Sequence, residues 1–174
     1  KMAKKPEFDF IEPKVIEMPA QKMAVVVTRG DPNQVSQSAM KAIFGAVYKI
    51  KFDLKKAGVD FKVDALRARW PDAHIVSKNE WEAHWALPVP DDTVTLVQKI
   101  PGMEVRLEMW EYGLVAQILH LGPFSTEGPT VQRLHDFILQ SGYEIQGVHE
   151  EHYLTRMDAK EQRTLIRYPI KKMG

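Results

Sequence analysis

The chain has 174 residues, of which 44% are hydrophobic and 27% charged, the mixture of an ordinary globular domain rather than a disordered segment. Lys and Arg number 24 against 23 Asp and Glu, so the net charge of +1 provides no field that would draw the molecule to nucleic acid or to an anionic membrane. Cysteine is absent, which excludes disulfides, thiolate nucleophiles and cysteine metal sites. We therefore expect one self-folding domain with neither nucleic acid nor membrane as a direct partner.

Residues 1–20 are predicted to form an arm that leads into the domain. Pro6, Pro13 and Pro19 interrupt any helix or central strand there. The segment is also too short and too rich in proline for a helix-turn-helix. No apolar run approaches the ~20 residues of a membrane span, and the first residues lack the apolar core of a signal peptide, so we expect a cytoplasmic protein.

The first half of the domain, about residues 21–100, has the pattern of a strand followed by a helix and two strands. A Gly30-Asp31-Pro32 turn separates the first strand from the helix, whose apolar residues recur at helical spacing until Gly58. The segment 93–97 is short and allows either an extended stretch or a helical turn. In chain order we predict a strand over 23–28, a helix over 33–57, and strands over 61–70 and 81–87.

The second half, about residues 101–174, repeats this order after two further apolar runs. Glu111-Tyr112-Gly113 separates those runs, which form either one long bent strand or a hairpin. Gly122-Pro123 then precedes a helix that starts near residue 126, where Ser125 or Thr126 would cap it. The predicted elements are strands over 103–110 and 114–121, a helix from about 126 to 140, and strands over 146–155 and 164–170.

The two halves show a weak internal similarity. Glu82-Ala83-His84-Trp85 matches Glu150-Glu151-His152-Tyr153, and both predicted helices follow a glycine-proline turn. We therefore predict an α+β fold made of a tandem, pseudo-twofold pair of βαββ modules within a single domain over 21–174. Its antiparallel sheets would carry the helices on one side, with a ligand cleft between the halves.

The densest polar and aromatic cluster lies on a predicted strand near the end of the chain. Side chains alternate along a strand, so His149, Glu151 and Tyr153 share one face, whereas Glu150 and His152 share the other. A buried carboxylate is costly unless it finds a cation, hydrogen-bond donors or a proton. A cationic ligand would therefore suit Glu151 if its face is buried.

Two other interpretations of this cluster remain open from the residues alone. Glu151 also fits a solvated sheet surface, or an ion pair with Arg156 or Arg167. A metal site is not expected, because His149 and His152 point to opposite faces and the spacing differs from that of zinc peptidases. No glycine-rich nucleotide-binding motif is present, so we expect no cofactor.

Four tryptophans fall in or next to the predicted strands, and three of them are candidate ligand contacts. Aromatic faces beside a carboxylate are a common way to hold organic cations. Trp85 matches the position of Tyr153, and Trp110 and Trp70 are further candidates for an aromatic wall. Glu108 shares a strand face with Trp110 and would add a second acid. The alternative is that the tryptophans are core residues and Glu108 is solvated.

The second half resembles the GyrI-like family, which is named for the gyrase-inhibitor protein and includes effector-binding domains of multidrug-responsive transcription regulators. The residues that carry the resemblance are VAQILHLGPF (115–124), EGPTVQRLHDFILQSGYEIQG (127–147), HEEHYLT (149–155) and TLIRYPI (164–170). The resemblance implies paired βαββ modules around a ligand cleft, with Glu151 as the acidic residue that meets the ligand. His152 departs from the family, where an aliphatic residue is usual, and no partner for its ring is evident.

We therefore expect a small-molecule-binding protein that captures apolar, cationic organic compounds. Glu151 would neutralise the charge, and His149, Tyr153 and the tryptophans would supply contact surface. The resemblance also implies a hydrolase as an alternative, because some free-standing members open strained cyclopropane compounds. Glu151 would then be a general base with a raised pKa, and Tyr153 or a second glutamate the acid. A gyrase-inhibitor type of protein binder ranks last, because no acidic mimic of DNA is present.

Overall fold

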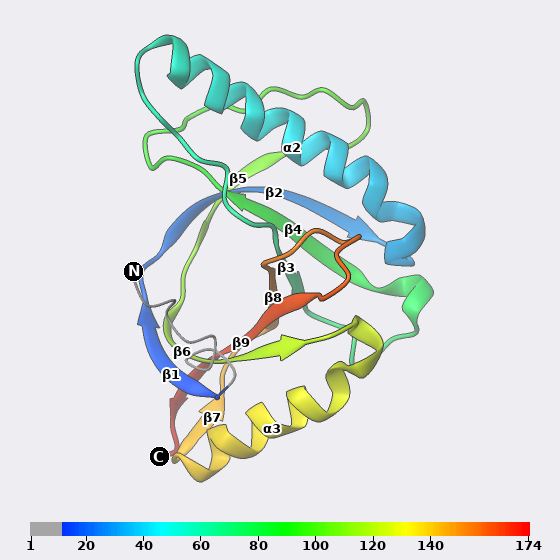
Figure 1. Cartoon of the computed structure of the whole chain (residues 1–174), viewed down its shortest axis with the longest axis vertical. Coiled ribbons are helices and arrows are strands. Elements are labelled where there is room, and N and C mark those ends of the chain that lie inside the picture. Colours follow the sequence, from blue (N-terminus) through cyan, green and yellow to red (C-terminus); the bar gives the residue numbers. More distant parts are fainter. Residues whose placement is uncertain (1–11) are drawn as a thin grey trace. The chain divides into compact units, whose positions relative to one another are not determined.

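The computed structural model describes residues 12–174, so the first eleven residues of the predicted arm lie outside the described part. The chain divides into two compact units (Figure 1). The central unit is Pro19–Glu111, and the terminal unit combines the described residues up to Met18 with Tyr112–Gly174. Within residues 12–174, each unit contains one α-helix and an antiparallel group of strands, which confirms the α+β class.

The central unit has its strands in the order β3-β4-β2-β5, and all three pairings are antiparallel. Helix α2 packs on β2 and β4 (Figure 1). A short 3-10 turn precedes β4. The bounds are β2 Gln21–Arg29, α2 Pro32–Lys56, β3 Arg67–Trp70, the 3-10 turn Lys78–Glu80, β4 Glu82–Pro88 and β5 Arg106–Trp110.

Helix α2 begins and ends where its sequence signals predict. The Asp31 carboxylate accepts a hydrogen bond from the Asn33 backbone N–H at 2.9 Å, and Pro32 occupies the first turn, where no N–H partner is needed. Gly58 follows the helix with a φ of +81°, a conformation that glycine adopts without steric cost. The buried face of the helix consists of small and β-branched residues: Ala39, Ala42, Ile43, Ala46 and Val47.

The terminal unit has its strands in the order β1-β6-β9-β8, with β7 pairing the far end of β9. Its strand-helix-strand-strand order matches that of the central unit, with β7 added. The bounds are β1 Lys14–Met18, β6 Gly113–Leu121, a 3-10 turn Phe124–Thr126, α3 Glu127–Gln140, β7 Tyr143–Ile145, β8 His149–Tyr153 and β9 Arg163–Lys172.

The core of the terminal unit lies between α3 and one face of β6 and β9. Leu134 and Ile138 on α3 are fully buried there. They pack against residues that share one strand face: Ala116, Ile118, Ile166, Tyr168 and Ile170. This packing defines the helix face of the sheet, and the opposite face carries the intervening residues.

Several elements differ from the sequence predictions. The strand predicted over 61–70 begins only at Arg67, and 93–97 contains neither a strand nor a helix. Gln98 follows that segment, and its side-chain amide exchanges hydrogen bonds of 2.7 and 2.8 Å with the backbone of Val105, as a strand neighbour would. A local side-chain interaction therefore replaces a ladder pairing at this point.

The segments that begin and connect the strands and helix of the terminal unit also differ from the sequence predictions. Strand β5 pairs with β2, whereas β6 pairs with β1 and β9, so the two runs around Glu111-Tyr112-Gly113 form separate strands rather than one hairpin. Strand β1 lies within the predicted arm, between Pro13 and Pro19, at the edge of the sheet where flanking prolines are tolerated. Thr126 precedes α3, but its hydroxyl donates to the Pro123 carbonyl at 2.9 Å instead of capping the helix.

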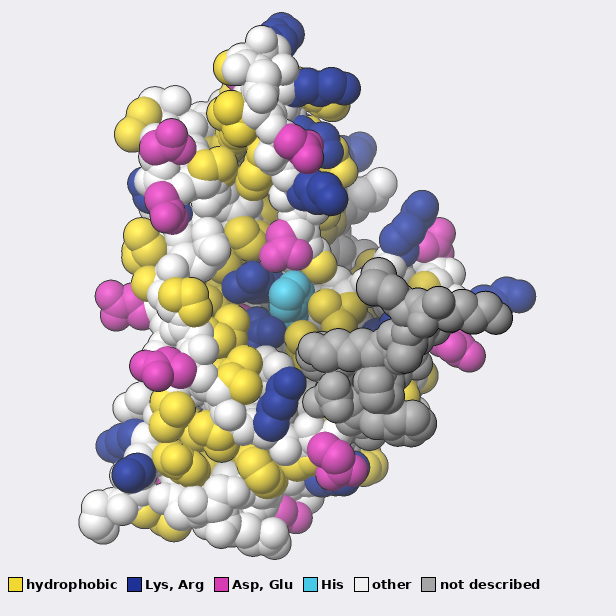
Figure 2. Space-filling model, turned by 60° about the vertical axis from the view of Figure 1, so that its left-hand side comes forward, with side chains coloured by type: hydrophobic (Ala, Val, Ile, Leu, Met, Phe, Trp, Pro, Cys, Tyr) yellow, Lys and Arg dark blue, Asp and Glu magenta, His cyan; other side chains and the backbone are white. Residues whose placement is uncertain are grey.

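The described surface in Figure 2 shows no dominant charge. On the face in Figure 2, acidic and basic side chains are interspersed with hydrophobic ones, and neither sign gathers into a broad patch. No helix within residues 12–174 is long and apolar enough to cross a membrane.

The core packing predicts different effects for two leucines on α3. Leu134→Ala removes a fully buried side chain and should lower the free energy of unfolding by about 2–5 kcal/mol. Leu139 is 58% exposed, so Leu139→Ala should change it by no more than about 0.5 kcal/mol. Urea denaturation of both variants measures the difference, and equal losses would contradict the assigned helix face.

Candidate functional site

Strand β8 carries two adjacent glutamates that are both buried, Glu150 at 2% and Glu151 at 7% exposure. Glu150 lies opposite Arg167 of β9, and Glu151 lies opposite Ile166. Because Ile166 belongs to the core under α3, Glu151 points to the helix face and Glu150 to the other face. The predicted alternation is confirmed, and each carboxylate must be balanced on its own side of the sheet.

Glu150 is neutralised by an arginine. Arg167 donates from Nη1 to Glu150 Oε2 at 2.7 Å, and both side chains are almost fully buried. The Tyr112 hydroxyl donates to both carboxylate oxygens at 3.0 and 3.1 Å. The predicted pairing of Arg167 with a glutamate therefore exists, but it involves Glu150 rather than Glu151.

The same arginine supplies the partner that the sequence did not reveal for His152. Arg167 donates from Nη2 to His152 Nδ1 at 3.2 Å, which places the proton of the neutral ring on Nε2. Its Nε lies 3.4 Å from Gln117 Oε1. One guanidinium thus connects three side chains on the face opposite the helix.

Glu151 is held by hydrogen-bond donors from neighbouring side chains. His149 Nε2 lies 2.9 Å from Glu151 Oε2, and the Tyr153 hydroxyl donates to Oε1 at 3.0 Å. The side chain of Glu127, the first residue of α3, is hydrogen-bonded to the same carboxylate. None of these partners is a lysine or an arginine.

The pKa shifts of the two glutamates have opposite signs. Burial, together with the hydrogen bond to Glu151 and the charge of Glu151, raises the pKa of Glu127 to about 9. Burial also acts to raise the pKa of Glu151, but the hydrogen bonds from His149, Glu127 and Tyr153, together with the charge interaction with His149, outweigh it and lower that pKa. At neutral pH the proton therefore stays on Glu127 and the negative charge on Glu151. The raised pKa expected for Glu151 is wrong, because its donors were not visible in the sequence.

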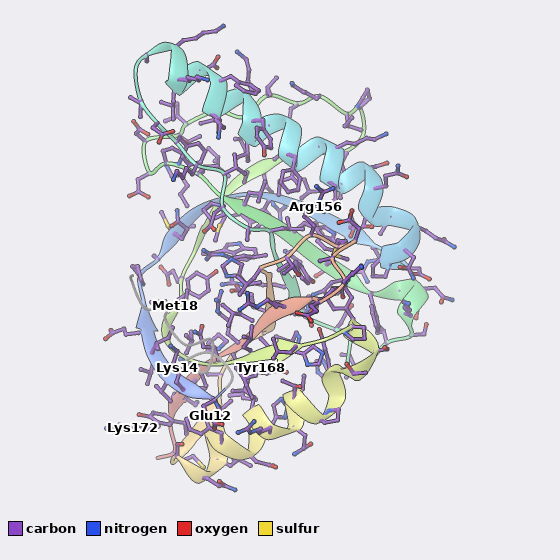
Figure 3. The ribbon with its side chains drawn as sticks, viewed as in Figure 1. Glu12, Lys14, Met18, Arg156, Tyr168 and Lys172 are labelled. Atoms are coloured by element: carbon purple, nitrogen blue, oxygen red, sulfur yellow. The ribbon has the colours of Figure 1, made fainter. Side chains whose placement is uncertain are left out.

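Aromatic rings surround this carboxylate within the terminal unit. Tyr168 of β9, labelled in Figure 3, lies 2.6 Å through its hydroxyl from His149 Nδ1. Burial and the nearby glutamates raise the pKa of Tyr168 to about 12, so the hydroxyl keeps its proton. Phe124 packs edge-on against Tyr153 with a centroid separation of 5.7 Å. Glu151 thus lies beside several flat apolar surfaces.

The tryptophans singled out from the sequence lie in the central unit, and they do not share one strand face. Trp70 and Trp85 lie on the same face, with ring centroids 5.3 Å apart, and Trp85 Nε1 donates to Thr28 Oγ1 at 2.9 Å. Trp110 lies on the opposite face, since Gln21 is its partner on β2 whereas Val26 is the partner of Trp85. The contact of these rings with a ligand stays a prediction.

Trp110 and Glu108 have partners of their own. The guanidinium of Arg69 lies over the Trp110 ring at 3.9 Å from its centroid. Glu108 accepts from Trp110 Nε1 at 3.3 Å, which confirms that they share a face, and it forms an ion pair with Arg106. A contact of Glu108 with a ligand remains a prediction as well.

Sequence reasoning missed Glu127, which the fold brings beside Glu151. The expectation that His149 and His152 would point to opposite faces is confirmed, so these two cannot share a metal ion. Glu127, His149 and Glu151, however, place one ligand atom each within 4.8 Å of one another. The only sequence signal for Glu127 was its position as an acidic residue at the start of a predicted helix. Glutamate is common there because it stabilises the helix, so this position alone does not indicate a functional site.

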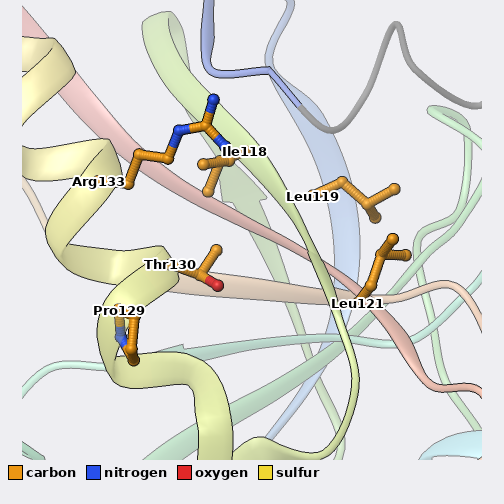
Figure 4. A pocket seen from close by; sticks show the side chains of 6 residues that line it. All are labelled: Ile118, Leu119, Leu121, Pro129, Thr130 and Arg133. Carbon is orange, nitrogen blue, oxygen red and sulfur yellow. The ribbon is translucent and has the colours of Figure 1, made fainter.

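A separate shallow pocket of about 340 Å³ opens between α3 and the end of β6 (Figure 4). Its lining residues are Ile118, Leu119, Leu121, Pro129, Thr130 and Arg133. None of them contributes to the Glu151 cluster. Since Arg133 also pairs with Glu12 at 2.7 Å, the charge at the pocket is already balanced.

The model of the GyrI-like small molecule binding domain matches residues 11–171 of the chain. Among solved structures, a hydrolase from Listeria innocua matches with a TM-score of 0.79 and 23% identity over 92% of both chains. An uncharacterized conserved protein from the same organism matches with a TM-score of 0.80 and 24% identity over the same shares. The C-terminal domain of EcmrR matches with a TM-score of 0.63 and 14% identity, over 93% of this chain and 98% of that one. No curated protein sequence matches.

The buried ion pair predicts a large stability effect. Arg167→Met leaves the Glu150 carboxylate buried without its cation and should lower the free energy of unfolding by about 3–5 kcal/mol. Adding Glu150→Gln removes the uncompensated charge and should recover part of this loss. Urea denaturation of the single and double variants tests the coupling, and strictly additive losses would speak against it.

Proposed function

The chain belongs to the GyrI-like family of small-molecule-binding domains, and from this premise we propose that it captures apolar, positively charged organic molecules with Glu151 as their counter-ion. The observation that carries the proposal is a buried, ionised carboxylate whose hydrogen-bond partners within residues 12–174 include no lysine or arginine. Its neighbour Glu150 is equally buried but has Arg167. A ligand cation would neutralise Glu151 on one face of the sheet, as Arg167 neutralises Glu150 on the other face.

The rings around Glu151 suit the apolar part of such a ligand. Tyr153, Tyr168 and Phe124 offer flat surfaces, and an organic cation over such a ring gains ~0.5–2 kcal/mol per good contact. Phe124 is 37% exposed, so part of this aromatic surface is open to solvent. Since Glu127 stays protonated, Glu151 is the ionised carboxylate of this pair, which favours monovalent organic cations.

Replacing the counter-ion should separate charged from neutral ligands. Glu151→Gln keeps the shape of the side chain but removes its charge, so affinity for a rhodamine-type cationic dye should fall about tenfold or more, equivalent to ~1.4 kcal/mol. Affinity for a neutral analogue of the dye should change little. Fluorescence anisotropy measures both, with Glu144→Gln, a partly exposed glutamate of the same unit, as the control variant. Equal losses for both dyes would reject the counter-ion role.

A hydrolase is the second candidate, and the division of protons between Glu127 and Glu151 favours it. The protonated Glu127 can act as a general acid and the ionised Glu151 as a general base, and the two groups are in contact. The similar structure of a Listeria innocua hydrolase is consistent with this candidate. It ranks second because the lowered pKa makes Glu151 a weaker base.

The reaction class would be the addition of water to a strained, electrophilic ring such as a cyclopropane. Glu151 accepts a proton from water while the oxygen bonds to a ring carbon. The carbon–carbon bond breaks, its electron pair passes to the carbon that leaves, and Glu127 supplies the proton for that carbon. The proton on Glu151 then returns to Glu127 through their hydrogen bond.

Isotope labelling tests the hydrolase directly. In water enriched in oxygen-18, catalytic turnover of a cyclopropane substrate should place one labelled oxygen in each product molecule, as mass spectrometry would show. Glu127→Gln cannot donate the proton, so its turnover should fall by about 10²–10⁴-fold, the usual contribution of general acid–base catalysis. Stoichiometric loss of the compound without turnover would instead support capture alone.

A further inference from the structure

We propose that Glu127, His149 and Glu151 together bind one divalent transition-metal ion. Their three ligand atoms already lie within 4.8 Å of one another, on two elements of the terminal unit, α3 and β8. The proposal concerns the same side chains as the capture of organic cations but does not require that an organic ligand binds. It therefore adds a ligand class that the proposed function does not include.

The donor set and its spacing fit such an ion. Two carboxylates and one imidazole are common ligands of zinc and of other first-row divalent metals, with bonds of about 2.0–2.2 Å. Ligand atoms on opposite sides of such an ion are therefore about 4.4 Å apart at most. The cluster needs to contract only slightly, and the Glu127 side chain, which starts from the first turn of α3, can rotate to do so.

Tyr168 prepares His149 for this role. Its hydroxyl lies 2.6 Å from Nδ1, which leaves Nε2 directed at Glu151 at 2.9 Å. With an ion on Nε2, the ring proton would move to Nδ1 and donate to the Tyr168 oxygen. Metal-bound histidines usually have such a partner on the second nitrogen, which fixes the tautomer and the ring orientation.

Glu127 provides a second observation, independent of the ligand spacing, that a bound ion would explain. Its Oε1 atom is buried and has no hydrogen-bond partner among the described residues. A buried acceptor without a partner is costly, and a metal ion would satisfy it. Two carboxylates also balance the +2 charge of such an ion.

The central unit contains a natural control. Glu82 and His84 on β4 have the same spacing as His149 and Glu151, with His84 Nε2 2.9 Å from Glu82 Oε2. This pair belongs to no group of three metal-ligating side chains within residues 12–174. The two histidine–glutamate pairs therefore differ in the third ligand, and a test on both isolates its contribution.

Titration of the untagged chain with Zn²⁺ by isothermal calorimetry, and with Co²⁺ by visible absorption, tests the proposal. We expect one ion per chain and cobalt bands typical of oxygen and nitrogen ligands. Glu127→Gln and His149→Gln should each lower the affinity at least tenfold, and Tyr168→Phe about 10–100-fold. His84→Gln should leave affinity and stoichiometry unchanged. In Glu127→Gln the amide N–H can still donate to Glu151, so the fold should persist, as circular dichroism would verify.

Two results would overturn the proposal: no ion bound at micromolar Zn²⁺, or equal binding by the wild type, Glu127→Gln and His149→Gln. Loss of binding in His84→Gln alone would place the ion elsewhere and would also reject it. Dye binding is measured without metal, so a failure here leaves the capture of organic cations standing. If dye binding fails, the metal titration still decides whether the cluster binds a metal ion.

Discussion

The terminal unit depends on how one strand balances two adjacent negative charges. Glu150 and Glu151 follow each other on β8, so they must point to opposite faces, and a single cation cannot serve both. Arg167 neutralises Glu150. Glu151 keeps its charge only because three donors converge on it. A buried carboxylate held in this way is stable enough to exist and still able to attract a cation.

This arrangement also decides which chemistry the site can perform. Because Glu127 carries the proton, Glu151 is a fixed negative charge rather than a strong base, which favours binding over catalysis. The same pair nevertheless contains a proton donor and a proton acceptor in contact. Within one fold, a modest change in either pKa would therefore shift the balance between capturing a compound and converting it.

The sequence predicted the class of the fold, the bounds of both helices within a few residues and the face shared by His149, Glu151 and Tyr153, because these features depend on local periodicity. Glu127 could not be predicted, because its approach to Glu151 depends on how α3 packs against the sheet. The opposite faces of Trp85 and Trp110 also escaped prediction, since their relation depends on the registers of β4 and β5 against β2. The Arg167 partner of His152 is likewise set by the register between β8 and β9.

The position of Phe124 has a consequence for how relatives of this chain diversify. The ring lies in a short 3-10 turn outside the sheet and is partly exposed, yet it packs on Tyr153 beside the buried charge. The strands behind it are held independently by the Arg167 network. Side chains of other sizes at this turn would change the packing on Tyr153 without disturbing the sheet, so under the proposed function evolution or protein engineering can alter ligand range here while leaving the scaffold intact.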